Sequence, residues 1–205
     1  MVAALLFSIA APLPSLAKEL ASKSANNNSD LIQALQQATY NRQDNSTDLD
    51  RLVWLSEMSD KIKRRIPNAF YRIRLLETVL EEASAQGLDP QLVLAVIDIE
   101  SNFDRYAESR VGAQGLMQVM PFWKKEYGHP SDDLYNPKVN IQYGCKILRY
   151  YMDRYSKTVN ALAAYNGSLG KKKYPNKIYK RLAKEWGFKE DIYSSKNQID
   201  LISAN

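Results

Sequence analysis

Residues 89–101 read DPQLVLAVIDIES, a mostly apolar run between a polar start and a polar end. Asp89 is a favoured N-cap residue and Pro90 suits the first helical turn, so this pair predicts the start of a helix. The residues that follow are apolar almost all the way round the helix, as expected for a helix buried in a domain core. We therefore expect this segment to lie at the centre of the fold.

Glu100 is the most informative residue, because it occupies the last turn of this helix. Ile97, Val96 and Val93 precede it by three, four and seven positions and share its face. Scarce water and the negative end of the helix dipole should both raise its carboxyl pKa. A carboxyl protonated near neutral pH can donate a proton to a leaving oxygen. The alternative is an ordinary solvated residue at a helix end.

A glycine-rich segment follows, with Gly112 and Gly115 three positions apart. Such glycines indicate tight turns or close backbone approach, where a polymer could lie against the main chain. If the next five residues are extended, Leu116, Gln118 and Met120 share one face, so the Gln118 amide points the same way as two apolar side chains.

Three further helices are predicted downstream. They cover 122–127 after Pro121, 137–155, and a segment from 161 that ends at Gly167 and places Tyr165 and Asn166 in its last turn. The helix at 137–155 carries one apolar stripe: Ile141, Cys145, Leu148, Met152 and Tyr155. The single cysteine excludes an internal disulfide, and its place in the stripe predicts a buried thiol.

Three motifs together resemble the soluble lytic transglycosylase (SLT) family of the lysozyme superfamily, whose members cut bacterial peptidoglycan. The motifs are Glu100-Ser101, Gly115-Leu116-Met117-Gln118 with Met120-Pro121 behind it, and Ala164-Tyr165-Asn166. They appear in the family's order at typical spacings, and the resemblance extends over about 65–190. The sequence departs from the family after Asn166, where it reads GSLGKKK and lacks the family's usual proline.

The resemblance implies a role for each matching residue. Glu100 corresponds to the single catalytic acid and base, Ser109 to a serine that hydrogen-bonds the reacting sugar, and Met120 to an apolar wall of the cleft. The substrate-binding residues implied in this way are Ser101, Ser109, Gln118, Met120, Tyr165, Asn166 and, on the far helix, Tyr179.

A second catalytic carboxylate, which two-carboxylate glycosidases require, is not evident. Asp98 projects from nearly the opposite side of the helix, Asp104 lies past its end, and Asp132 and Asp133 lie in a polar stretch typical of solvated loops. By resemblance, Glu100 protonates the oxygen between N-acetylmuramic acid and N-acetylglucosamine, and a 1,6-anhydro product forms without water. Two alternatives remain: a lysozyme that hydrolyses the same bond, and a glycan-binding module without turnover.

The chain of 205 residues is predicted to be mainly α, a lysozyme-like (SLT) catalytic domain with an N-terminal helical extension. Residues 2–11 are apolar but too short to span a bilayer, and Ser15-Leu16-Ala17 resembles a signal-peptidase site. The predicted parts are a signal peptide at 1–17, a flexible linker at 18–47 with at most a marginal helix near 31–39, a helical extension of two amphipathic helices at 48–87, the transglycosylase domain at 88–190 and a tail at 191–205.

The charge and composition of the chain limit the classes of binding partner that we expect. The formal net charge of +5 is concentrated in runs at 61–65 and 171–173, and the second run borders the proposed cleft, where it could attract peptide carboxylates. His129 is the only histidine and no metal-ligand spacing occurs, so no metal or cofactor is expected. We expect a monomeric, periplasmic or secreted protein that binds peptidoglycan glycan strands, without a lipoprotein cysteine, an integral membrane span or a nucleic-acid partner.

Overall fold

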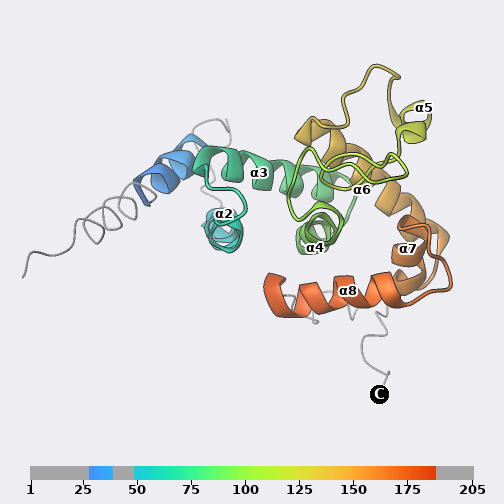
Figure 1. The fold of residues 1–205 in the computed structure, drawn as a ribbon. Helices are drawn as coiled ribbons and strands as arrows, with labels where there is room; N and C mark the ends of the chain where they lie inside the picture. Colours follow the sequence, from blue (N-terminus) through green and yellow to red (C-terminus); the bar gives the residue numbers. More distant parts are fainter. Residues whose placement is uncertain (1–27, 39–48, 188–205) are drawn as a thin grey trace, which may run out of the picture.

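The computed structural model describes residues 28–38 and 49–187, which form a mainly helical fold (Figure 1). The elements after the first helix, at 28–38, are α2 (Leu49–Ile62), α3 (Ala69–Ala85), α4 (Pro90–Ser101), η1 (Pro121–Trp123), α5 (Lys124–Tyr127), α6 (Pro137–Arg154), α7 (Thr158–Tyr165), α8 (Lys173–Arg181) and η2 (Leu182–Trp186). Within these ranges the extended pairings are two isolated bridges, Glu108 with Gln114 and Gln114 with Val119. The predicted mainly α class is confirmed.

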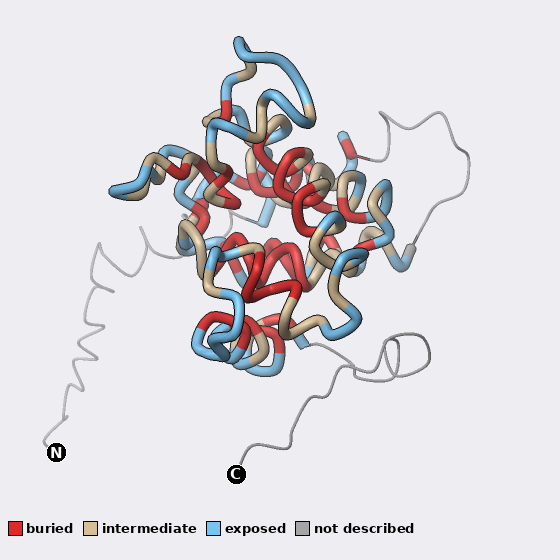
Figure 2. The backbone as a smooth tube through the Cα atoms, turned by 90° about the vertical axis from the view of Figure 1, so that its right-hand side faces the viewer, coloured by how far each residue is buried: buried red, intermediate tan, exposed pale blue. Residues whose placement is uncertain are grey.

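The central helix α4 begins where the sequence predicts. The Asp89 carboxylate accepts hydrogen bonds from the backbone N–H groups of Gln91 at 2.5 Å and Leu92 at 3.3 Å, with Pro90 in the first turn. Residues 93–97 are completely buried. The helix packs against α3, α8 and η2, and the buried residues gather in the middle of the molecule, as Figure 2 shows.

The long helix α6 supports the other side of the domain, packing against α3 and α7. Its predicted stripe is buried at Ile141, Cys145 and Leu148. Burial raises the pKa of the Cys145 thiol far above its ordinary value, as expected for an unreactive core cysteine. Gly144 faces Met117 so closely that a β-carbon there would overlap the methionine side chain, so α6 lies directly against the loop before η1.

The helices α2 and α3 lie in the region where the sequence predicts a two-helix extension. They pack on each other, and Arg51 of α2 forms an ion pair with Glu77 of α3. Arg65, after α2, lies 3.4 Å from the buried Asp98 carboxylate of α4 and so ties this region to the central helix.

The predicted signal peptide lies outside the described residues, as do the predicted tail and most of the predicted linker. Part of that linker, residues 28–38, forms a helix in which Ala34 and Ala38 are buried against the core. This segment, where the sequence predicts at most a marginal helix, therefore packs on the domain. None of the described helices is both long enough and apolar enough to cross a membrane.

The extended conformation considered for Leu116–Met120 is wrong. Residues 115–118 instead form a tight turn closed by a 3.1 Å hydrogen bond from the Gln118 N–H to the Gly115 carbonyl, and both residues have positive φ. The turn buries Leu116 while leaving Gln118 partly exposed. The two side chains therefore do not share a face.

Candidate active site

Glu100 lies at the meeting point of two adjoining pockets. The larger, of about 420 Å³, and the smaller, of about 240 Å³, are both lined by Glu100 and Asn166. Glu100 is in the last turn of α4, and Asn166 is the C-cap residue of α7. The ends of these two helices therefore bring a carboxyl and an amide together at the centre of one cleft.

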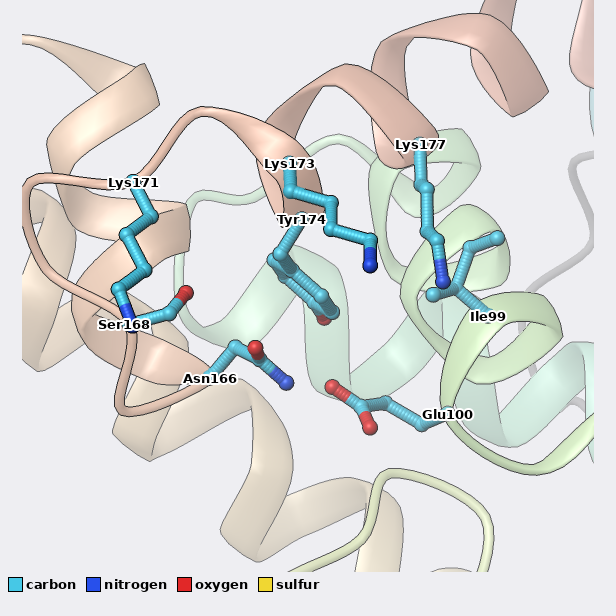
Figure 3. A pocket seen from close by; sticks show the side chains of 8 residues that line it. All are labelled: Ile99, Glu100, Asn166, Ser168, Lys171, Lys173, Tyr174 and Lys177. Carbon is cyan, nitrogen blue, oxygen red and sulfur yellow. The ribbon is translucent and has the colours of Figure 1, made fainter.

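Burial raises the pKa of the Glu100 carboxyl above its ordinary value. The Tyr174 hydroxyl, the Asn166 amide and the Lys177 ammonium lower the pKa in turn, because each favours the ionised form, but the effect of burial is larger. Figure 3 shows Tyr174 and Asn166 directed toward the carboxyl. The site thus favours the protonated acid and also offers partners for the carboxylate that remains after proton transfer.

The larger pocket collects most of the residues that the sequence singles out. These residues share a position, because each lies on the loop between α4 and η1 or at the end of α7. They are Ser109, Gln118, Met120, Tyr165 and Asn166. Aromatic side chains that the sequence analysis did not single out extend the wall: Phe122, Trp123 and Tyr151.

Two of these polar side chains are held by the loop but keep hydrogen-bonding capacity. The Ser109 hydroxyl accepts a 3.0 Å hydrogen bond from the Ala113 N–H, which leaves its own proton available. The Gln118 amide nitrogen donates to the carbonyls of Ala107 and Gly115, both at 3.0 Å, which leaves its oxygen available as an acceptor. The loop therefore fixes these side chains without using all their polar atoms.

Tyr165 and Asn140 anchor this loop from the helices behind it. The Tyr165 hydroxyl donates a 2.8 Å hydrogen bond to the Met117 carbonyl. The fully buried Asn140 amide accepts from the Met117 N–H at 2.8 Å and donates to the carbonyls of Gln114 and Leu134 at 2.8 and 2.7 Å. The position of the cleft wall thus depends on one amide of α6 and one phenol of α7.

Ser101 and Tyr179 do not line either pocket. The Ser101 hydroxyl lies 2.8 Å from the Leu116 carbonyl and 3.1 Å from the Ile97 carbonyl, so it connects α4 to the turn. Tyr179 is partly buried on α8, where it packs against the core. This placement suits a structural contribution from both residues.

Tyr174 lies beside Glu100, and the sequence analysis did not predict it as a site residue. It is 6% exposed, and its buried hydroxyl faces the cleft without a hydrogen bond of ordinary geometry in the described part of the chain. The signal for it is helical spacing: Tyr174, Ile178 and Arg181 recur at intervals of four and three, which defines the face of α8 toward α4. Tyr179 falls outside this stripe.

Comparison with known proteins identifies the family of this chain. The family model described as the transglycosylase SLT domain matches residues 77–188, more than half of the chain, and the match begins inside α3. This chain belongs to the SLT domain family. The resemblance inferred from the three motifs is confirmed.

Individual relatives of this SLT domain match over about half of the chain. A transglycosylase of Enterobacteria phage PRD1 is 37% identical over 113 residues, which are 52% of this chain and 42% of that protein. A membrane-bound lytic murein transglycosylase C of Glaesserella parasuis is 36% identical over 114 residues, 47% of this chain and 31% of the relative. The chain thus spans less than half the length of these relatives.

Among solved structures, the lytic transglycosylase Slt of Pseudomonas aeruginosa, in an inactive mutant form, is 28% identical to this chain. The alignment has a TM-score of 0.42 and covers 65% of this chain and 21% of that one.

Glu100 is the only carboxyl among the residues that line the two pockets of this SLT domain. Asp98 is fully buried on another face of α4, where it lies 3.4 Å from Arg65 and 3.6 Å from Arg181. Asp132 accepts hydrogen bonds from the Tyr143 hydroxyl and the His129 N–H and lines neither pocket. In the described ranges no group of three or more His, Cys, Asp or Glu residues could hold a metal ion.

Proposed function

We propose that this chain is a peptidoglycan lytic transglycosylase that uses Glu100 as its single general acid and base. The observation that supports this most strongly is the isolation of Glu100: it is partly buried, its pKa is raised, and it is the only carboxyl in the lining of the cleft. The family match and the murein transglycosylases among the relatives agree with this activity.

The first step needs a proton donor beside the scissile bond. Glu100, whose pKa is raised by burial, donates its proton to the oxygen between N-acetylmuramic acid and N-acetylglucosamine. The neighbouring N-acetyl group of the muramic acid stabilises the positive charge that develops at C1. The polar atoms of Ser109, Gln118 and Asn166 hold the sugar in place. They raise the reaction rate by orienting the sugar and by presenting dipoles that are already in position.

The second step needs a base, and the same residue supplies it. Ionised Glu100 removes the proton from the C6 hydroxyl of the muramic acid, and the C6 oxygen closes on C1 to give the 1,6-anhydro sugar. Asn166, Tyr174 and Lys177 favour this carboxylate between the two steps. No water and no second carboxylate take part.

The same proposal includes export to the periplasm or beyond and action as a monomer on glycan strands. Export rests on the apolar segment and cleavage pattern in residues 1–17, which lie outside the described ranges.

Mass spectrometry of fragments released from purified peptidoglycan sacculi tests this function. We expect muropeptides with 1,6-anhydro ends, which are lighter by one water than hydrolytic products. Hydrolytic ends would identify a lysozyme, and binding to sacculi without soluble fragments would identify a glycan-binding module. Either result would contradict the proposal.

A second test concerns the residue beside the acid. The Tyr174 hydroxyl lowers the pKa of Glu100, so Tyr174→Phe should raise that pKa further. Because the first step needs protonated Glu100, kcat/KM falls as the pH rises through this pKa. We therefore expect the descending limb of the pH–kcat/KM profile to move to higher pH in Tyr174→Phe.

Tyr179→Phe is the matched control, since Tyr179 is on the same helix but lines neither pocket. Its descending limb should coincide with that of the wild type. A Tyr174→Phe profile that is unmoved, or that moves to lower pH, would remove Tyr174 from the environment of the acid.

A further inference from the structure

The two pockets beside Glu100 differ in charge. The smaller pocket is lined by three lysines, Lys171, Lys173 and Lys177, and its only acidic residue is Glu100. The larger pocket is lined by no lysine or arginine. One end of the cleft is therefore strongly cationic, while the other end is neutral apart from the catalytic acid.

The three ammonium groups have no hydrogen-bond or ion-pair partner among the described residues, and a long-range attraction joins Lys177 to Glu100. On the same helix, by contrast, Arg181 lies 3.6 Å from Asp98 and 3.7 Å from Glu185. In Figure 3, Lys173 and Lys177 extend from α8 on the side of Tyr174 and Glu100. These charges are thus available to a ligand in the cleft.

The position of the lysines works against the stability of α8. Lys173 is the first residue of the helix, Lys172 is its N-cap residue, and the first turn contains no acidic residue. Cations at a helix N-terminus oppose the helix dipole, and the free N–H groups there add to the local positive potential. An anion bound in the pocket would offset both effects.

We propose that this cationic pocket binds carboxylates of the peptide that N-acetylmuramic acid carries on its lactyl group. The proposal rests on the function proposed above. The sugars and their N-acetyl groups are uncharged and suit the neutral pocket, whereas the charges of peptidoglycan lie mainly on the peptide. The neutral pocket thus binds the sugars, and the cationic pocket on the other side of Glu100 binds the peptide. The enzyme therefore prefers strands that keep charged peptides.

The size of this preference follows from the exposure of the lysines. All three are solvent-exposed, so each pair with a carboxylate is weak and sensitive to salt. For two or three such pairs we expect about a tenfold advantage in kcat/KM at low ionic strength. The advantage should shrink as salt is added.

Paired substrates measure the preference. Soluble peptide-bearing strands are compared with the same strands after carbodiimide coupling to ammonia, which converts the carboxylates to amides. Release of 1,6-anhydro ends is followed on both substrates. The readout is the kcat/KM value for the peptide-bearing strands divided by the kcat/KM value for the amidated strands. A third substrate, stripped of peptide by an amidase, carries only the free lactyl carboxylate.

The informative variant is Lys171→Gln/Lys173→Gln, which leaves Lys177 in place because its charge also lowers the pKa of Glu100. The matched control is Lys180→Gln/Lys184→Gln, which removes the same charge from exposed positions that line neither pocket. We expect the ratio to fall at least about threefold in the first variant, through KM, and to stay at the wild-type value in the control.

The outcomes separate the two proposals. If wild-type protein releases no anhydro ends from any substrate, the proposed function fails. If it releases them with a ratio near one, or if both variants lower the ratio equally, the cationic pocket does not recognise peptide carboxylates. Stripped strands that are cleaved as well as peptide-bearing strands would assign recognition to the lactyl carboxylate and overturn the peptide proposal.

Discussion

Glu100→Gln should lower the release of 1,6-anhydro muropeptides by about 10²- to 10⁴-fold, because the amide can neither donate the first proton nor accept the second. The loss should appear in kcat, while binding to sacculi persists, since the side chain keeps its shape and the larger pocket is unchanged. Turnover is measured by mass spectrometry and binding by co-sedimentation. Glu126→Gln, at an exposed position of α5, is the control and should match the wild type.

The stability of the same variant supplies an independent check. A carboxyl whose pKa is raised on folding stabilises the native state below its unfolded pKa, and that contribution is lost as the pH rises through the folded pKa. A neutral amide does not titrate. We therefore expect the free energy of unfolding of Glu100→Gln to rise relative to wild type between acidic and neutral pH. Retained turnover would remove Glu100 from the mechanism, and a falling difference would contradict its raised pKa.

The site's acid could be predicted because its signals are local. Asp89 and Pro90 set the start of α4, and helical spacing then placed Glu100 on the same face as Val96 and Ile97. Burial as the leading cause of the raised pKa follows from the same spacing. Such short-range patterns can be interpreted from the sequence alone, because a helix fixes which side chains share a face.

The shape of the cleft wall could not be predicted in this way. The turn at 115–118 depends on positive φ at Gln118, which a non-glycine residue adopts only when surrounding contacts require it. Those contacts come from Asn140 and Tyr165, which lie 23 and 48 positions from Met117 along the chain. Tyr174 was missed for a related reason, because its role depends on how α8 packs against α4.

Asn140 supports the cleft wall from a position outside both pocket linings. Its side chain is fully buried, and three hydrogen bonds join it to Met117, Gln114 and Leu134. Gly115 faces both Asn140 and the Leu134 carbonyl so closely that a β-carbon there would overlap them. The loop, the amide and the start of α6 are therefore packed as one unit.

Asn140→Leu should lower the free energy of unfolding by about 4 kcal/mol, because it leaves the buried Met117 N–H and the buried Leu134 carbonyl without partners, whereas the Gln114 carbonyl keeps the Val119 N–H. Urea denaturation measures this loss, and Asn176→Leu, at an exposed position of α8, should change stability by less than about 0.5 kcal/mol. Folded Asn140→Leu should also show reduced kcat/KM, because the turn that carries Gln118 loses its support. If both variants unfold at the same urea concentration, Asn140 does not hold the cleft wall.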